Sequence, residues 1–128
     1  MRLLVDTCTF LWMVADPDRL SPAAASMLVE PEHEVLLSAA SCWEIAFKYE
    51  LGKLTLDRPP ERYVPEERAR HGVAQLAIDE PATLHLHRLP PVHRDPFDRM
   101  LVCQALAGAL AIVTPDPHIA RYPVHVIW

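Results

Sequence analysis

The chain has 128 residues, of which 51% are hydrophobic and 23% are charged, and its formal net charge at pH 7 is −5. This length suits one domain that spans residues 1–128, and the apolar fraction is large enough to form a core. The negative charge argues against a general nucleic-acid coat protein, but it does not exclude a nuclease whose acids hold cations.

Neither a membrane span nor a secretion signal is expected. No apolar run approaches the length needed to cross a bilayer, and the N-terminus reaches Asp6 without the hydrophobic region of a signal peptide. We therefore expect a cytoplasmic protein. Its three cysteines, Cys8, Cys42 and Cys103, are odd in number and far apart, so we expect all three to be buried, reduced thiols and we expect no disulfide framework or zinc site.

The first predicted element is a short apolar strand, residues 3–5, that ends at Asp6. A helix follows, with Thr7 as its expected N-cap. An aspartate at the tip of the first strand of a buried sheet is a common functional position, and it can equally be a helix cap. Ser21 and Pro22 then predict the start of a second helix.

Glu44 lies in a helix that is expected after the second strand, residues 35–38. Ser41 precedes Glu44 at the spacing of a capping box, and Lys48 follows it at the spacing of an ion pair. Both are structural explanations for this acid. Because Glu44 also shares a helical face with apolar residues, the alternative is an inward carboxylate whose burial a nearby cation would offset.

The rest of the chain completes an α/β pattern. We expect an exposed polar helix over residues 61–71. The arginines of this region are expected to form a solvated face or, alternatively, to contact phosphates; they are Arg58, Arg62, Arg68 and Arg70. A short strand within 73–78, a helix over 81–88 and a final strand over 124–128 are also predicted. This order of elements predicts a three-layer α/β/α fold with a mostly parallel central sheet.

The segment HRDPFDRMLVCQALAGALAIVTPD, from His93 to Asp116, predicts a helix, a short buried strand and an aspartate after the strand. Asp95 precedes Pro96 and is the expected N-cap. Asp98 lies in the first turn and shares the apolar face of the helix. Two structural alternatives stay open here, a capping box between Asp95 and Asp98 and a helix cap by Asp116.

Four acids are thus expected at the carboxyl edge of the sheet or at a helix start that faces it: Asp6, Glu44, Asp98 and Asp116. Carboxylates that converge in one crevice repel each other, and hard cations relieve this repulsion. Oxygen ligands alone suit Mg²⁺ or Mn²⁺, which can activate a water molecule at a phosphodiester. His93 lies beside these acids and is a candidate to assist them.

Four segments of the chain, LLVDT, SAASCWEIAFKYELGKL, HRDPFDRMLVCQALA and IVTPD, resemble the PIN-domain ribonucleases, and most closely the VapC-type toxins of bacterial toxin–antitoxin modules. The resemblance covers nearly the whole chain in the right order. It implies Mg²⁺-dependent endonucleolytic cleavage of RNA, a homodimer and inhibition by a cognate antitoxin. It also implies Asp6 and Asp98 as the main metal ligands, with Glu44 and Asp116 completing the acidic site. Cys8 stands where relatives often carry His, so no proton-transfer role is carried over to it.

Two other functions fit parts of the sequence. A non-catalytic interaction module would keep the fold and bind a partner, although the retention of all four acids counts against it. A phosphoryl-transfer protein would use Asp6 as its nucleophile. An aspartate-based phosphatase of that kind would need a second Asp two residues later, where Cys8 stands.

Large apolar residues are concentrated in two predicted helices, at Phe10, Trp12 and Met13 and at Trp43 and Phe47. They exceed what one small core can absorb. We therefore expect a homodimer and a groove that accepts an apolar helix of the antitoxin.

Overall fold

The computed structural model describes residues 1–128, the whole chain. Its centre is a five-stranded parallel sheet in the order β3-β2-β1-β4-β5. The strands are β1 (Arg2–Val5), β2 (Glu34–Ser38), β3 (Val73–Leu76), β4 (Ala111–Val113) and β5 (Val126–Ile127). The helices are α1 (Thr7–Ala15), α2 (Pro22–Val29), α3 (Ala39–Glu50), α4 (Pro60–Arg70), α5 (Glu80–Thr83) and α6 (Pro96–Gly108), and three short 3₁₀ turns join them.

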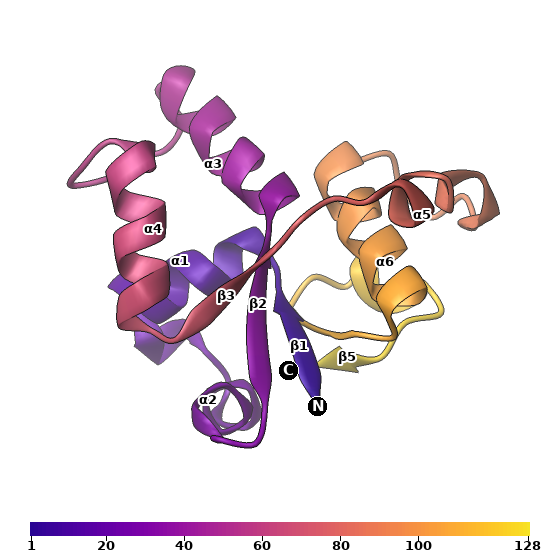
Figure 1. Cartoon of the computed structure of the whole chain (residues 1–128), viewed down its shortest axis with the longest axis horizontal. Helices are drawn as coiled ribbons and strands as arrows, with labels where there is room; N and C mark the ends of the chain where they lie inside the picture. Colours follow the sequence, from indigo (N-terminus) through magenta and orange to yellow (C-terminus); the bar gives the residue numbers. More distant parts are fainter.

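The sheet has a hydrophobic core on each face, because successive strand side chains point to opposite sides. Leu3 and Val5 of β1 pack with α1, α2, α3 and α4 on one face. Leu4 packs on the other face, mainly against Leu101 and Val102 of α6. Figure 1 shows α1, α3 and α4 on one side of β1 and β2, with α6 on the other. The predicted three-layer α/β/α fold is therefore confirmed, and every strand pairing is parallel.

Two predicted helix caps are wrong by a few residues. Asp6 is the N-cap of α1 and accepts a hydrogen bond from the Thr9 backbone N–H, so Thr7 is the first helical residue. Ser38, and not Ser41, caps α3 by accepting from a backbone N–H in its first turn. The strand β2 runs directly into α3, so the strand's last residue also caps the helix. This leaves Ser41 buried inside the first turn, and the predicted capping box does not form.

The middle of the chain departs further from the prediction. The polar helix α4 buries one side, including Tyr63, Val64 and the carboxylate Glu67. Glu67 accepts hydrogen bonds from Arg58, which precedes the helix, and from Arg70. The side chains of Arg62 and Arg70 are 63% and 68% exposed, as the expected solvated face requires, whereas Arg58 is turned toward the buried acid. The helix predicted over residues 81–88 is divided into α5 and a separate 3₁₀ turn.

The cysteines form no disulfide, and their burial differs from the expectation. All three cysteines are free, but only Cys103 is buried, whereas Cys8 and Cys42 are partly exposed. None of the helices combines the length and the apolar character needed to cross a membrane.

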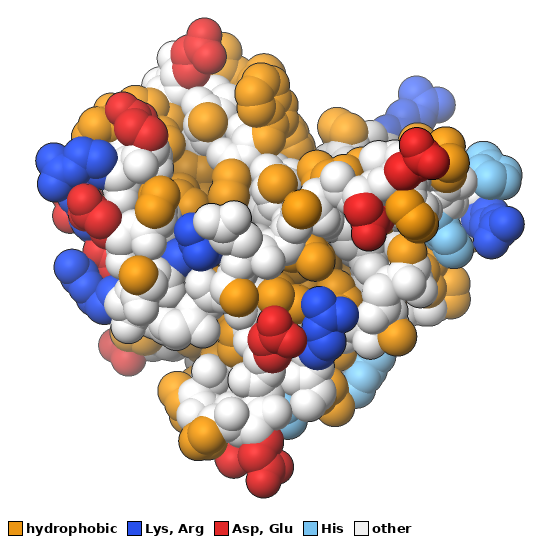
Figure 2. Space-filling model, in the orientation of Figure 1, with side chains coloured by type: hydrophobic (Ala, Val, Ile, Leu, Met, Phe, Trp, Pro, Cys, Tyr) orange, Lys and Arg blue, Asp and Glu red, His pale blue; other side chains and the backbone are white.

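Apolar side chains remain on the surface of α3. Trp43 and Phe47 are exposed, as the expectation of an interface requires, and Figure 2 shows apolar side chains along this helix. A cavity of about 700 Å³ opens between α3, α4 and β3 and is lined mostly by apolar residues. On α1 the expectation is wrong for Phe10, which is fully buried in the core, whereas Trp12 is half-buried against Trp128.

The topology brings separate segments to one edge of the sheet. β1 is the middle strand and pairs in parallel with both β2 and β4. The carboxyl ends of these three strands therefore lie side by side. In open α/β folds, ligands bind in the crevice outside this edge.

Candidate active site

Asp6, at the end of β1, is the most tightly held of the four predicted acids. Its Oδ1 accepts from the Thr9 backbone N–H at 2.9 Å, and its Oδ2 accepts from the Thr114 hydroxyl at 2.5 Å. The side chain is buried, and these donors compensate for its lost hydration. Each carboxylate oxygen has two lone pairs, so Asp6 keeps the capacity to bind a cation.

Cys8 donates its thiol proton to Asp6, with Sγ 3.4 Å from Oδ1 and 3.5 Å from Oδ2. Burial and the negative charge of Asp6 raise the pKa of the Cys8 thiol to about 12. The group is therefore a protonated donor at neutral pH. It is neither a thiolate ligand nor a general base, so this position supports Asp6 rather than proton transfer.

Thr114 and Asp116 follow β4 and link that strand to β1. The Thr114 hydroxyl accepts from the Asp116 backbone N–H at 3.0 Å while it donates to Asp6. Asp116 Oδ1 accepts from the His118 backbone N–H at 2.8 Å, and its Oδ2 has no donor. Asp116 therefore forms an Asx turn at the start of the last loop, and its Oδ2 remains available to bind a cation. Thr114 was not among the predicted site residues, although it directly follows a buried strand.

Asp98 lies in the first turn of α6, which Asp95 caps as predicted by accepting from two backbone N–H groups. Its Oδ2 lies 3.2 Å from Nε2 of His93, and its Oδ1 has no partner. Burial, followed by the charges of Asp95, Asp116 and Glu44, raises the pKa of Asp98 from 3.8 to about 7, although the hydrogen bond from His93 acts in the opposite direction. Asp98 is therefore a partly buried carboxylate that lies near three other carboxylates.

Glu44 is buried and points inward from α3, as the alternative of an inward carboxylate predicted. It also forms the predicted ion pair with Lys48. Its Oε1 accepts from the Thr7 hydroxyl at 2.6 Å, and its Oε2 accepts from Lys48 Nζ at 2.5 Å. The hydrogen bond to Glu44 raises the pKa of Lys48, and the charges of Asp95 and Asp98 add to this effect. Lys48 is half exposed, so a cation stands at the margin of the acidic site.

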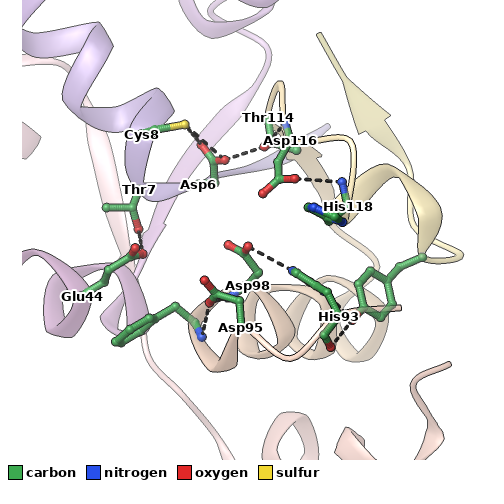
Figure 3. A network of polar contacts seen from close by, with 12 residues as sticks. Asp6, Thr7, Cys8, Glu44, His93, Asp95, Asp98, Thr114, Asp116 and His118 are labelled. Atoms are coloured by element: carbon green, nitrogen blue, oxygen red, sulfur yellow. Dashed lines mark hydrogen bonds and ion pairs between the residues drawn. The ribbon is translucent and has the colours of Figure 1, made fainter. Parts of the chain in front are cut away.

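The structure brings the predicted acids around one space. In Figure 3 the carboxylates of Asp6, Asp98 and Asp116 point toward one another, and Glu44 lies to one side beside Thr7. Asp95 instead turns to the backbone of its own helix. Carboxylates from β1, α6 and the end of β4 therefore share one opening.

This donor set fits a hard divalent cation. The ligands available are carboxylate oxygens, and burial together with the charges of Asp95, Asp116 and Glu44 raises the pKa of Asp98, so a cation at this site would stabilise its ionised form. No three His, Cys, Asp or Glu side chains are arranged to hold one ion directly. Mg²⁺ commonly binds through one or two carboxylates and keeps several waters, so this arrangement suits it.

Two sequence relatives of this chain are named ribonucleases. Ribonuclease VapC16 of Mycobacterium tuberculosis (strain ATCC 25618 / H37Rv) is 35% identical over 99 residues, which are 77% of this chain and 66% of that protein, so the chain spans less than two thirds of that relative. Ribonuclease VapC22 of the same strain is 29% identical over 130 residues and is covered at 98%, as is this chain.

Solved structures share the fold at low sequence identity. VapBC2 from Rickettsia felis, bound to a DNA fragment from its promoter, has a TM-score of 0.73 and 13% identity over 98% of this chain and 97% of that chain. DNA-bound VapBC from Salmonella typhimurium has a TM-score of 0.68 and 18% identity over 98% and 96% of the two chains. Residues 3–124 match the PIN domain family, and the chain therefore belongs to that family.

Proposed function

We propose that this chain is a divalent-metal-dependent endoribonuclease and the toxin of a toxin–antitoxin module. The observation that carries the proposal is the convergence of Asp6, Asp98 and Asp116, from three separate segments, on one space at the carboxyl edge of the sheet. Two sequence relatives are named ribonucleases, which supports RNA as the substrate. An enzyme that cleaves cellular RNA acts in the cytoplasm, where we place the chain.

Asp6 and Asp98 would hold Mg²⁺ or Mn²⁺, and Asp116 and Glu44 would complete the acidic site. When bound, such an ion lowers the pKa of a water molecule and stabilises negative charge at the phosphodiester. The chain keeps Asp6 in place through Thr114 and its own helix start. Asp98 and Asp116 each offer an oxygen that no protein group occupies.

Lys48 is the residue that we propose for contact with a phosphate of the RNA. Its ammonium group uses one donor on Glu44, which leaves two of its three donors for phosphate oxygens. The raised pKa of Lys48 keeps it charged throughout the neutral range. A cation at this margin attracts the RNA backbone toward carboxylates that would otherwise repel it.

Cleavage of end-labelled RNA by the purified chain tests this function. EDTA should abolish cleavage, and added Mg²⁺ or Mn²⁺ should restore it. Asp6→Asn and Asp98→Asn should be inactive, whereas the matched control Asp95→Asn should keep much of the activity because Asn caps a helix about as well as Asp. Cleavage that survives complete chelation, or that is unchanged in Asp98→Asn, would contradict the proposed mechanism.

We further propose that the apolar surface of α3 and the adjoining cavity accept a helix of the cognate antitoxin, and that the chain forms a homodimer. Trp43 and Phe47 are exposed on α3, and the cavity of about 700 Å³ lies between this helix, α4 and β3. The solved neighbours are VapBC structures, which supports an antitoxin partner. An arginine of the antitoxin could also pair with the acids of the site.

Light scattering of the purified chain and of charged variants tests the interfaces. Phe47→Glu should weaken the homodimer or the capture of a co-expressed antitoxin. Val29→Glu, a control at an exposed apolar position on α2, should change neither. A chain that stays monomeric at high concentration would contradict the dimer. An antitoxin complex that tolerates Phe47→Glu would contradict the use of the exposed apolar surface of α3, since Phe47 does not line the cavity itself.

A further inference from the structure

His93 connects Asp98 to a buried tyrosine. The His93 side chain lies in the loop before α6 and is 14% exposed. Its Nε2 lies 3.2 Å from Asp98 Oδ2, and its Nδ1 lies 2.9 Å from the Tyr122 hydroxyl. Tyr122 is only 3% exposed and follows the last 3₁₀ turn, so its hydroxyl is held in place by the core.

The Tyr122 hydroxyl has two possible acceptors on His93, since it lies 2.9 Å from Nδ1 and 3.5 Å from the backbone carbonyl oxygen. A neutral imidazole has one N–H donor and one acceptor nitrogen, and a phenol has a single proton to donate. If Tyr122 donates to Nδ1, the proton of His93 must be on Nε2, where it points at the carboxylate of Asp98. The opposite tautomer would direct a lone pair of Nε2 at a carboxylate oxygen, which is repulsive. The shorter distance to Nδ1 and an ionised carboxylate at Asp98 both favour the arrangement in which Tyr122 donates to His93 and His93 donates to Asp98.

The same imidazole also contacts the other side of the site. The rings of His93 and His118 are stacked, with centroids 5.2 Å apart and an interplanar angle of 10°. The backbone N–H of His118 donates to Asp116 Oδ1. His93 thus lies between the segment that fixes Asp98 and the segment that fixes Asp116, as Figure 3 shows.

We infer that His93 is a positioning residue: its Nε2–H, oriented by Tyr122, holds Asp98 Oδ2 and directs Oδ1 toward the space shared with Asp6 and Asp116. This inference rests on the proposed function, in which Asp98 is a metal ligand. Hydrogen bonds to metal-binding carboxylates fix the orientation of the ligand and contribute to metal affinity. In this role His93 acts on the metal site only through Asp98.

The competing explanation is that His93 only packs against His118, and two substitutions separate the two roles. His93→Gln removes the ring but offers an amide N–H that can reach the position of Nε2. His93→Phe keeps a ring that can stack on His118 but has no N–H. A third variant, Tyr122→Phe, keeps the packing of the buried tyrosine and removes only the hydroxyl that orients the imidazole.

The affinity for Mn²⁺ alone, measured by electron paramagnetic resonance of free Mn²⁺, is the primary measurement, and thermal melting verifies that each variant is folded. His93→Phe should bind Mn²⁺ roughly 10- to 100-fold more weakly than the wild type. His93→Gln should recover most of this loss, and Tyr122→Phe should fall between them. RNA cleavage at saturating Mn²⁺ should show a lower kcat for His93→Phe with the KM for RNA little changed.

Each outcome separates this inference from the function on which it rests. Wild-type affinity for Mn²⁺ in His93→Phe with weak binding in His93→Gln would overturn the inference and assign His93 to packing alone. Wild-type affinity in Tyr122→Phe would overturn the role of the hydroxyl. If the wild type and Asp98→Asn bind Mn²⁺ equally, the proposed function fails, and the positioning role fails with it.

Discussion

Replacing Asp98 by Asn is expected to stabilise the metal-free protein while it nearly abolishes cleavage. Asp98 is a partly buried carboxylate near Asp95, Asp116 and Glu44, and these surroundings raise its pKa to about 7. Asn has almost the same shape and can still accept the hydrogen bond from His93 through its amide oxygen. The substitution therefore removes a repelled charge and a metal ligand, with little change in packing.

The sign of the effect follows from the protons bound in each state. Because the pKa of Asp98 is higher in the folded protein than its ordinary value of 3.8, the folded state binds more protons than the unfolded chain between about pH 4 and pH 7. The stability of the metal-free wild type should fall across this window as pH rises. A shift of one pKa unit corresponds to about 1.4 kcal/mol of folding free energy. Because the site is open to solvent, the effect should be smaller than the full shift implies. We therefore expect Asp98→Asn to be about 1–2 kcal/mol more stable than the wild type above pH 7.

Thermal melting with and without Mg²⁺ is the assay. In a domain of this size, about 1 kcal/mol corresponds to a change in Tm of about 4 °C. Metal-free Asp98→Asn should therefore melt above the wild type at about pH 8 and together with it near pH 4. Added Mg²⁺ should raise the Tm of the wild type and of Asp95→Asn, because a ligand that binds only the folded state stabilises it, but it should hardly affect Asp98→Asn.

Two results would refute this reasoning. A metal-free Asp98→Asn variant that melts below the wild type at about pH 8 would show that the carboxylate is compensated by groups other than a cation. Loss of the Mg²⁺ effect in Asp95→Asn, with retention in Asp98→Asn, would show that the capping residue and the metal ligand have been assigned in reverse.

Three further predictions address the surroundings of the site. The thiol of Cys8 has a pKa of about 12, so at about pH 8 it should be alkylated roughly 100- to 1,000-fold more slowly than an ordinary cysteine. Mass spectrometry measures this rate, which Asp6→Asn should increase, and fast alkylation of the wild type would contradict the prediction. Gln104→Leu removes the partner of the buried Ser38 hydroxyl and should cost about 1–3 kcal/mol in urea unfolding. Leu101→Ala should cost about 2–5 kcal/mol through the cavity that it leaves in the core, and a smaller loss would show that the core repacks.

Local signals in the sequence were sufficient for most of the strands and for the start of α6, but not for the order of the strands in the sheet. The apolar runs predict the strands, and Asp95 with Pro96 predicts the start of the helix, because both depend on neighbouring residues. The cap of α3 was mispredicted because Ser38 and Ser41 both suit a helix start. Ser38 is the cap because β2 continues into α3 without a loop. The absence of a loop depends on how β2 packs in the sheet.

The sequence predicted the four acids and the ion pair of Glu44 with Lys48, but it did not predict the hydroxyl groups of Thr114 and Tyr122 that contact Asp6 and His93. Thr114 is 108 residues from Asp6, and Tyr122 is 29 residues from His93, so no local spacing links either pair. The buried Glu67 was missed for the same reason, since its partner Arg58 lies outside the helix that carries it. Thr114 reaches Asp6 only because the parallel strands β1 and β4 end side by side, and the other two pairs depend on how loops pack against α4 and α6.

The acids differ in how many of their oxygens the protein already binds, and this leads to a final prediction. Both oxygens of Asp6 accept hydrogen bonds, from Thr9 and Thr114, whereas Asp98 and Asp116 each keep one oxygen without a donor. Asp6→Asn would turn an amide NH₂ group toward one of these donors, so it should destabilise the metal-free protein by about 1–2 kcal/mol. The same melting experiment should thus give opposite signs for Asp6→Asn and Asp98→Asn, although both abolish cleavage. If Asp6→Asn also melts above the wild type, repulsion among the carboxylates outweighs the hydrogen bonds at Asp6, and this ranking of the acids is wrong.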